Sequence, residues 1–457
     1  MMERFKNHRE ISKAGFDALT KVIEYSCSRC GLCAGLCPEG AITMIDTVPK
    51  LTGECTKCGL CYQGCPRSFY PQQKVKEKYF GLEKTEFDQR VGCCIKNYTS
   101  RSLTDEFFSI GANGGTTTAL LYYLLENKMI DAVLHLESIH DDCYICHHAK
   151  TRVSTRAADV LKGAKSKNQL TPVLHDLETL SEYKKTAIVT LSCQTRALRK
   201  IQVMKDDEEL KKLFPLLAKR SEELIGNLKY IIGINCFSST KYGAIDKIYE
   251  HFKVKEQDVI KYAEDTKKSL YQFLNEGKTF HWYVQDGFMT KDGKYYPFKY
   301  TDFLEESIPM GCMLCPSTII CKEADISIGV TASDLKLKEF GYNSIFLRNP
   351  ELSDIMDRMI EEGKILKRPM WENKGPLLRK FVEKMIRPKD LMNFREFVRT
   401  GKWNPSEDLY KRSSSVQGGK IMGLQRLFLA QTVKKNLMYI PASNAVKEAG
   451  KHITEMI

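Results

Sequence analysis

Eight cysteines between Cys27 and Cys65 form two copies of one motif, and this repeat constrains the chain more than any other feature. The copies read CSRCGLCAGLCP and CTKCGLCYQGCP, and each is a C-x2-C-x2-C-x3-C-P run. Three thiolates at this spacing reach one iron–sulfur cube, and the fourth Cys of each run ligates the other cluster. The pattern therefore predicts two [4Fe–4S] clusters, the first held by Cys27, Cys30, Cys33 and Cys65 and the second by Cys37, Cys55, Cys58 and Cys61.

Disulfides and zinc knuckles are the other common uses of clustered cysteines. Disulfides persist in oxidising compartments, but the opening stretch MMERFKNHREISKAG is polar and has no apolar signal core. Structural zinc sites use two separated C-x2-C pairs rather than four Cys in eleven residues followed by Pro. We therefore expect a redox protein in a reducing compartment, with the cytoplasm as its location.

Length and sequence pattern divide the chain into three parts. With 457 residues it has room for two or three domains. We expect a bacterial-type 2[4Fe–4S] ferredoxin domain with a helical lead-in over residues 1–75 and a polar linker from Pro66 to Tyr79. A larger α/β domain is expected over residues 76–350, and a helical extension over 351–457.

The basic charge is concentrated in the C-terminal extension. From residue 364 onward the chain has 20 Lys and Arg against 8 Asp and Glu, which is +12 of the total +13. Amphipathic helices of this kind dock on a partner or an anionic membrane surface, or fold back onto their own domain with solvated basic faces. The last is the simplest expectation. No nucleic-acid-binding motif accompanies the charge, and no apolar run is long enough to span a membrane.

A glycine-rich turn in the second part joins a predicted strand to a predicted helix. In FFSIGANGGTTTALLYYLLE, Gly114 and Gly115 precede Thr116, which opens an apolar-striped helix, and the run DAVLHLE follows as a strand. A loop of this kind at a helix start binds phosphate groups. A tight turn that requires positive φ explains the glycines equally well.

Two further predicted strands, TAIVTLSC and LKYIIGINC, each end on a cysteine. Ligands gather at the carboxyl ends of strands in α/β sheets, so Cys193 and Cys236 indicate a shared site, with a helix expected after Cys193. Downstream, a C-x2-C pair alone fits zinc, dithiol or cluster chemistry. Together, Cys193, Cys236, Cys312 and Cys315 supply four thiolates, enough for a third [4Fe–4S] cluster, unless the first two are buried structural thiols.

The five remaining cysteines have less specific surroundings. Cys93 and Cys94 fall in VGCCIKNY, an expected strand, as packing residues. Cys143 and Cys146 precede His147 and His148 in a polar segment that either binds a metal or carries these residues incidentally. Cys321 is an alternative ligand for the third cluster.

Two further stretches predict secondary structure. A hairpin turn is expected at Lys291-Asp292-Gly293-Lys294, and the stretch PELSDIMDRMIEEGKIL is expected to be helical.

Several blocks taken in order resemble the coenzyme F420 hydrogenase/dehydrogenase β-subunit family. They are the cysteine repeat, GANGGTTTALLYYLLE, GAKSK, LSCQTRALRK, IGINC and CMLCPSTIICKEADISIG, and they extend from about Cys27 to Arg348. The resemblance implies an FAD-binding α/β domain with a cluster next to the flavin on Cys193, Cys236, Cys312 and Cys315. It also implies flavin contacts from Asn113, Gly114, Gly115, Thr116, Ser166, Lys167, Gln194 and Arg196.

Two positions depart from the family pattern. Asn113 replaces a Ser, and Leu191-Ser192-Cys193 replaces a Gly-x-Pro-Cys motif. Both lie beside the expected flavin, so they bear on the substrate more than on the fold.

The resemblance implies that FAD exchanges a hydride with coenzyme F420 while the clusters relay single electrons to or from a redox partner at the ferredoxin domain. Lys167 and Arg196 would bind the acidic tail of coenzyme F420 or the FAD diphosphate. The protein would work in a complex or a homo-oligomer. Two alternatives stay open: the same flavin core acting on NAD(P)H or another organic substrate, and a flavin-less electron-transfer subunit that docks through its basic C-terminus.

Overall fold

The computed structural model describes residues 2–80, 92–139, 149–165, 167, 169–236, 239–255, 258–262, 286–298, 309–313, 320–330 and 341–369. Among these residues no helix is long and apolar enough to cross a membrane. The described part contains a cysteine-rich N-terminal region, a large mixed sheet covered by helices, and a small three-stranded sheet.

The N-terminal region begins with two helices, as expected for the lead-in, and continues with two short helices that follow the cysteine loops. The segment between the loops is a hairpin whose turn residues Asp46 and Thr47 have φ values of 49° and 64°. Positive φ at both turn positions matches the twist of a two-residue hairpin, and the alternating sequence AITMIDTVPKL, which predicts a short strand pair, forms that hairpin. The elements are α1 (Met2–Ser12), α2 (Asp17–Tyr25), α3 (Leu32–Gly35), β1 (Ile42–Ile45), β2 (Val48–Leu51) and α4 (Leu60–Gly64).

The segment after Pro66 is not simply a polar linker, because it contains helix α5 (Gln72–Tyr79). Val75 is fully buried, and the ammonium group of Lys74 lies 2.8 Å from the Asp207 carboxylate. The helix thus attaches the N-terminal region to the following domain.

The large sheet has eight strands in the order β13-β3-β12-β11-β7-β6-β4-β5. Its centre, from β11 to β4, is parallel, and the remaining neighbours pair antiparallel. The strands predicted at 131–137, 186–193 and 228–236 are confirmed as β4, β6 and β7. The bounds are β3 (Lys96–Ser102), β4 (Ala132–Ser138), β5 (Ala149–Ser154), β6 (Thr186–Leu191), β7 (Leu228–Ile234), β11 (Ile326–Val330), β12 (Asn343–Leu347) and β13 (Ile365–Arg368).

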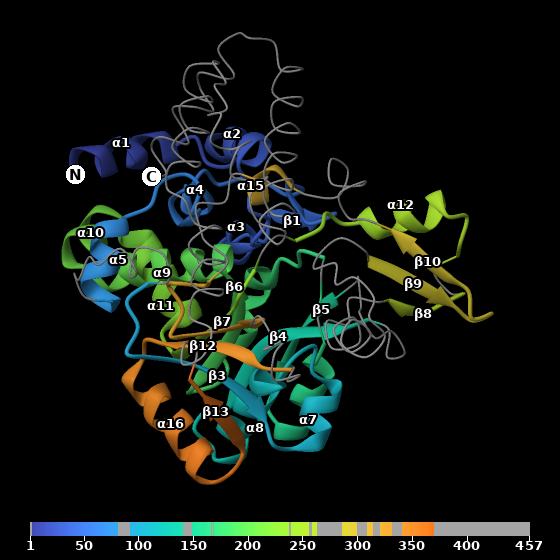
Figure 1. Ribbon diagram of the computed structural model, residues 1–457. Coiled ribbons are helices and arrows are strands. Elements are labelled where there is room, and N and C mark those ends of the chain that lie inside the picture. The colour runs from blue at the N-terminus through green and yellow to red at the C-terminus, as the bar shows by residue number, and fades with distance from the viewer. Residues whose placement is uncertain are drawn as a thin grey trace, which may run out of the picture.

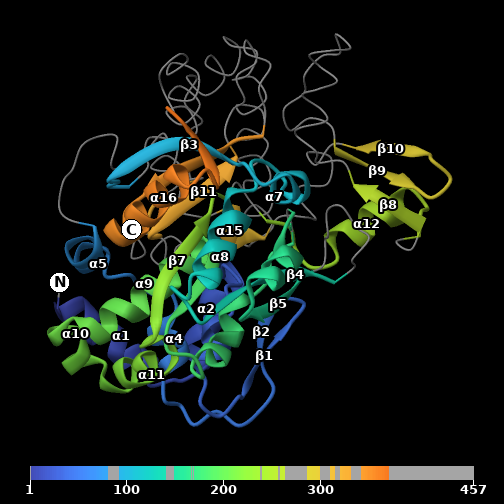
Figure 2. The ribbon, with the colours of Figure 1, turned by 90° about the horizontal axis from the view of Figure 1, so that it is seen from below.

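Helices cover both faces of this sheet, so that Figures 1 and 2 show a layered domain. One apolar core joins α8 and α16 to the sheet, and a second joins α9 and α11 to the sheet and to the N-terminal region. The cysteine-rich region therefore shares a core with the α/β domain. The helices are α7 (Asp105–Ile110), α8 (Thr116–Glu126), α9 (Ser192–Asp206), α10 (Glu208–Leu213), α11 (Pro215–Ile225) and α16 (Pro350–Glu361), with the 3-10 segments η1 (Ala157–Gly163) and η2 (Val173–Leu180).

Three sequence expectations need correction. Strand β3 begins at Lys96, so Cys93 and Cys94 lie before it rather than within it. The helix expected after Cys193 is divided at Asp207, whose carboxylate accepts hydrogen bonds from the first backbone N–H groups of α10. The stretch after Asn349 is helical only to Glu361, because Ile365–Arg368 pairs with β3. The boundary expected at residue 351 therefore falls inside the sheet-forming region, and residues 370–457 lie outside the described part.

The small sheet stands to one side of the large one in Figure 1. Its strands are β8 (Val259–Tyr262), β9 (Asp286–Thr290) and β10 (Tyr295–Phe298), and they pack on α12 (Ala244–His251) through a separate apolar cluster. The hairpin predicted at Lys291–Lys294 is confirmed, with Gly293 at φ 80°. The short helix α15 (Met310–Met313) follows the small sheet in the chain and packs on the N-terminal region.

Candidate iron–sulfur and flavin sites

The two cysteine loops have the same backbone conformation. Gly31 and Gly59 occupy the left-handed region, with φ 89° and 77°, and each begins a short helix. Arg29 and Lys57, two residues earlier, also have positive φ, at 54° and 56°. Because non-glycine residues rarely adopt this conformation, its recurrence at both positions confirms that the sequence repeat is a structural repeat.

The inner thiol set consists of Cys27, Cys30, Cys33 and Cys65. Burial raises the pKa of Cys27 to about 12 and that of Cys30 to about 11, and it also raises the pKa of Cys33 and Cys65. The thiols raise one another's pKa further by charge repulsion, which places them close together. The backbone N–H groups of Arg29 and Arg67 donate to the sulfur atoms of Cys27 and Cys65 at 3.3 and 3.4 Å.

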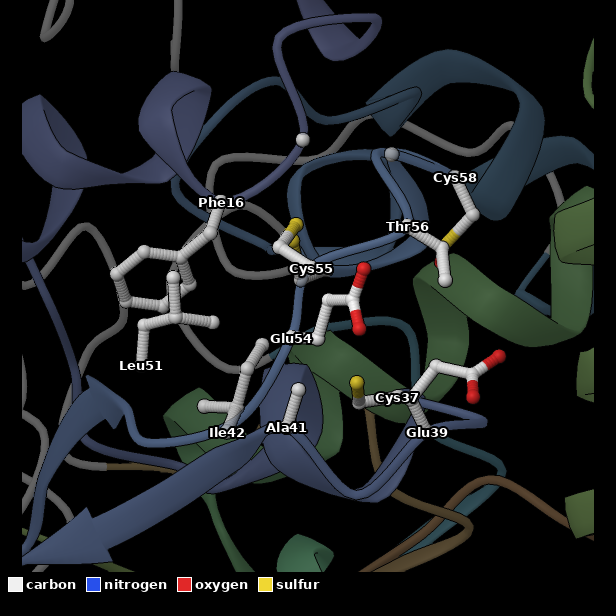
Figure 3. Close-up of a pocket in the computed structure, with 13 residues that line it drawn as sticks. Phe16, Cys37, Glu39, Ala41, Ile42, Leu51, Glu54, Cys55, Thr56 and Cys58 are labelled. Carbon is white, nitrogen blue, oxygen red and sulfur yellow. The ribbon is translucent and has the colours of Figure 1, made fainter.

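The outer thiol set consists of Cys37, Cys55, Cys58 and Cys61, and these four side chains line one pocket. Figure 3 shows sulfur atoms of this set around the pocket together with the carboxylates of Glu39 and Glu54. The glutamates are exposed, whereas Cys61 is buried. The four residues come from both cysteine runs, which is the crossed grouping that the spacing predicts.

The chemistry of both sets fits an iron–sulfur cluster. Metal ligation requires thiolates, but burial and mutual repulsion disfavour them in the inner set and at Cys61, so that a positively charged group is needed there to hold them deprotonated. Iron would supply that charge. Among the described residues no three His, Cys, Asp or Glu side chains converge as they would on a single ion. Ligation by these eight residues stays a prediction.

The inner set lies at the interface with the α/β domain. The backbone N–H of Leu174 in η2 donates to the Cys30 carbonyl at 3.1 Å. On the other side, a Cβ atom at Gly311 in α15 would lie 2.0 Å from the Cys27 carbonyl oxygen. The contact is close enough that glycine is required at this position.

Two buried cations also belong to this interface. Arg67, which is 2% exposed, donates to the Gly311 carbonyl at 2.8 Å. The ammonium group of Lys200, which is fully buried in α9, lies 2.6 Å from the Cys65 carbonyl oxygen and 3.5 Å from the centre of the Phe69 ring. Sequence reasoning missed both residues, because no local pattern marks a cation that becomes buried only when two regions pack together.

Strand register supports the expectation that Cys193 and Cys236 share one edge of the sheet. Leu191 of β6 pairs with Ile234 of β7, and each cysteine lies two residues beyond the paired end of its strand. Both side chains are partly buried. The parallel arrangement thus brings the two chain segments together, as the strand-end argument requires.

The other thiols assigned to the third cluster are only partly described. Cys312 in α15 follows Gly311 and therefore lies next to the inner set, whereas Cys315 lies outside the described residues. Cys321 is buried, with its sulfur 2.9 Å from the Thr195 hydroxyl and packed against Gly233 of β7. Burial raises the pKa of Cys321 to about 11. The third cluster stays a prediction.

The glycine turn before α8 is packed tightly against the protein itself. Gly115 has φ 70°, and a Cβ atom at Gly114 would lie 2.7 to 2.9 Å from Asn343 Oδ1 and from the Ser100 and Gly341 carbonyl oxygens. Asn343 Oδ1 also accepts from the backbone N–H of Thr116 at 3.2 Å. Close packing thus accounts for both glycines. Gly115 itself offers no side-chain cap, and the Asn343 amide accepts the first N–H group of α8 in its place.

Three of the other residues nominated for the flavin make contacts within the protein. The Gln194 amide accepts from the Leu191 N–H and donates to the Thr171 carbonyl, both at 2.8 Å. The Arg196 guanidinium lies 3.5 Å from the centre of the Tyr70 ring, and the Lys167 ammonium group donates to the carbonyls of the η1 end. Asn113 lies in the turn before α8. The nominated Ser166 and the cluster of Cys143, Cys146, His147 and His148 lie outside the described residues.

The fold and its cysteine loops define an iron–sulfur protein in which a ferredoxin-like region is joined to an α/β domain. The sequence matches a 4Fe-4S binding domain over residues 20–43. It also matches the N-terminal and C-terminal domains of the coenzyme F420 hydrogenase/dehydrogenase β subunit over residues 97–178 and 183–372. The chain therefore carries both domains of this β-subunit family together with a 4Fe-4S domain.

Several similar proteins have names that refer to coenzyme F420. The chain is 28% identical to coenzyme F420-dependent sulfite reductase of Methanocaldococcus jannaschii over 74% of its length, but it spans only 46% of that protein. It is 22% identical to coenzyme F420 hydrogenase subunit beta of Methanosarcina barkeri, covering 65% of this chain and 91% of that subunit. The fold is also similar to a chain of the F420-reducing [NiFe] hydrogenase complex from Methanosarcina barkeri, with a TM-score of 0.52, 20% identity, and coverage of 68% and 94%.

Proposed function

We propose that this chain is an oxidoreductase that exchanges electrons with coenzyme F420 through FAD and relays them through [4Fe–4S] clusters to or from a redox partner. The observation that carries the proposal is the packing of the inner thiol set directly against the α/β domain. Gly311 contacts the Cys27 backbone and η2 contacts that of Cys30. Short distances between redox centres are what an electron relay requires.

The protein's own contribution is binding and orientation. When bound, FAD would supply the hydride chemistry and the conversion between electron pairs and single electrons. The N–H donors at the start of α8 would hold an anionic part of the flavin, and Cys193, Cys236, Cys312 and Cys315 would hold a third cluster near it. Gln194 fixes the start of α9 rather than presenting a free amide.

A flavin-less electron-transfer subunit is the second candidate. It is favoured by the internal contacts of Gln194, Arg196 and Lys167, three side chains nominated for the flavin. In that case the chain would join other subunits as a relay, with its basic C-terminal segment as the docking element. NAD(P)H in place of coenzyme F420 is a third version of the same chemistry.

Flavin content and donor preference separate these candidates. The protein would be purified and reconstituted anaerobically, its FAD quantified, and reduced coenzyme F420 or NADPH mixed with it by stopped flow. Bleaching of the flavin by reduced coenzyme F420 alone supports the proposal. Bleaching by NADPH alone would replace the substrate, and a preparation without FAD would leave the relay subunit.

The third cluster has an independent test. Three clusters contain about twelve irons per chain, and the ferredoxin-like pair alone contains about eight. Cys312→Ala is expected to lower the iron content by about four, whereas Cys93→Ala, a partly buried cysteine outside the proposed ligand set, should leave it unchanged. Full iron content in Cys312→Ala would refute this ligation.

A further inference from the structure

The charges around the two thiol sets have opposite signs. Arg29 and Arg67 donate backbone N–H groups to sulfur atoms of the inner set and the Lys200 ammonium group donates to the Cys65 carbonyl, whereas Glu39 and Glu54 line the pocket of the outer set. We infer that the cluster on the inner set has the higher reduction potential, so that a single electron shared by the two clusters resides on the inner one. This inference rests on the proposed ligation of both sets and adds an order of potentials.

The inner cations are arranged to act on the ligands. Arg67 donates its backbone N–H to the Cys65 sulfur, and its guanidinium is held on the Gly311 carbonyl at 2.8 Å. Lys200 approaches the Cys65 carbonyl from the α/β side at 2.6 Å, and Arg29 follows Cys27 in the first loop. These residues come from three separate parts of the chain, and burial raises the pKa of Cys27 and Cys65 while the charges of Arg29, Lys200 and Arg67 oppose that rise.

Charge determines the sign of the effect. A reduced cluster carries one more negative charge than an oxidised cluster, and nearby charge is one of the factors that set the potential. Burial alone would lower the potential of the inner cluster, because low dielectric disfavours added charge. The same low dielectric strengthens the attraction to cations that are themselves buried. Arg67 is 2% exposed and a guanidinium keeps its charge when buried, so its attraction for the added electron outweighs the effect of burial.

The outer pocket lacks comparable compensation. Glu39 and Glu54 would repel the added electron, and the cation of this loop, Lys57, is exposed along with them. Solvent screens all three charges, so their effect is smaller than that of the buried cations. The difference between the sites favours transfer in which the outer cluster is oxidised by one electron and the inner cluster is reduced by one. Electrons that enter at the outer pocket thus move toward the sheet.

The test is a redox titration of the reconstituted full chain with dithionite, followed by electron paramagnetic resonance, which needs neither coenzyme F420 nor a flavin. Cys58→Ala removes an outer ligand and Cys30→Ala an inner one, so the midpoint lost in each variant belongs to that set, and the one lost in Cys58→Ala is expected to be the lower of the two. Loss of the higher of these two midpoints in Cys58→Ala would overturn the inference. Because no hydride donor is present, this result is separate from that of the flavin assay.

Charge variants then test the cause. Arg67→Met is expected to lower the inner midpoint and leave the outer one unchanged, Arg67→Lys to restore most of the shift, and Glu54→Gln to raise the outer midpoint by a smaller amount. Lys364→Met, an exposed lysine between α16 and β13, is the matched control without effect. If Arg67→Met does not fold, Arg29→Met gives the same measurement, since the Arg29 charge also acts on an inner thiol. Unchanged midpoints in the folded cation variants would refute the electrostatic cause.

Discussion

The contact between α3 and η2 gives a sharp test of how the ferredoxin-like region is attached. Gly35 lies in α3, and a Cβ atom there would lie 2.3 Å from the Leu174 carbonyl oxygen. In an isolated helix Gly→Ala stabilises by about 1 kcal/mol. Here the alanine must move α3 by about 1 Å to reach an ordinary contact, and overpacking of this kind costs about 1–3 kcal/mol. Loss of the Leu174–Cys30 hydrogen bond adds about 1 kcal/mol.

The net expectation for Gly35→Ala is a loss of about 1–3 kcal/mol, measured as a lower unfolding midpoint of the anaerobic protein in urea. Iron should also be released to a chelator faster, because the displaced loop holds inner ligands. Gly363→Ala is the control, since Gly363 has φ 66° and nothing within 4 Å of its Cβ position. It should cost about 1 kcal/mol through backbone strain and leave iron release unchanged. A Gly35→Ala protein as stable as the parent would show that α3 does not press on η2.

Two further predictions concern the α/β domain. Burial lowers the pKa of His135 to about 4, below its unfolded value of about 6.5, so stability is lost as pH falls through that window. By pH 5 this loss of folding stability is about 2 kcal/mol. Urea titrations of His135→Gln should show a correspondingly weaker pH dependence of stability. An unchanged dependence would contradict the lowered pKa of His135. Asp207→Ala removes the cap of α10 and the partner of Lys74, and it should lower the free energy of unfolding by about 1–2 kcal/mol. Asp207→Asn keeps the cap, and the loss should be less than half of that. Equal losses in the two variants would show that the ion pair, not the cap, stabilises this end of the helix.

The sequence predicted local features whose cause is local. The spacing of the cysteines, the alternation of the hairpin between them and the apolar runs of β4, β6 and β7 each depend on neighbouring residues, and the structure contains all of these elements. The grouping of Cys37 with Cys55, Cys58 and Cys61 also followed, because a crossed fourth ligand is a property of the repeat.

Features that depend on packing between distant segments could not be predicted. Ile365–Arg368 continues an amphipathic pattern and reads as helix, but its backbone pairs with β3, more than 250 residues earlier in the chain. Gln194 was nominated for a cofactor through the family resemblance, and its amide bridges Leu191 and Thr171. In the sequence, Arg67 and Lys200 cannot be distinguished from ordinary surface residues, because their burial depends on packing between the two regions.

The shared core bears on how electrons would cross between the two regions. A ferredoxin-like region on a flexible tether would sample many distances from the α/β domain, and transfer would depend on its encounters. Here Leu32 and Leu36 belong to the same apolar cluster as Leu174 and Leu217 of the α/β domain. Gly64 also packs against Leu36, with Leu217 just beyond. Separating the regions would expose this core and leave Lys200 without its contacts to Cys65 and Ser68, so the inner thiol set stays fixed relative to the sheet. Any partner that exchanges electrons with the outer set must therefore approach its pocket, rather than rely on movement of the region that carries it.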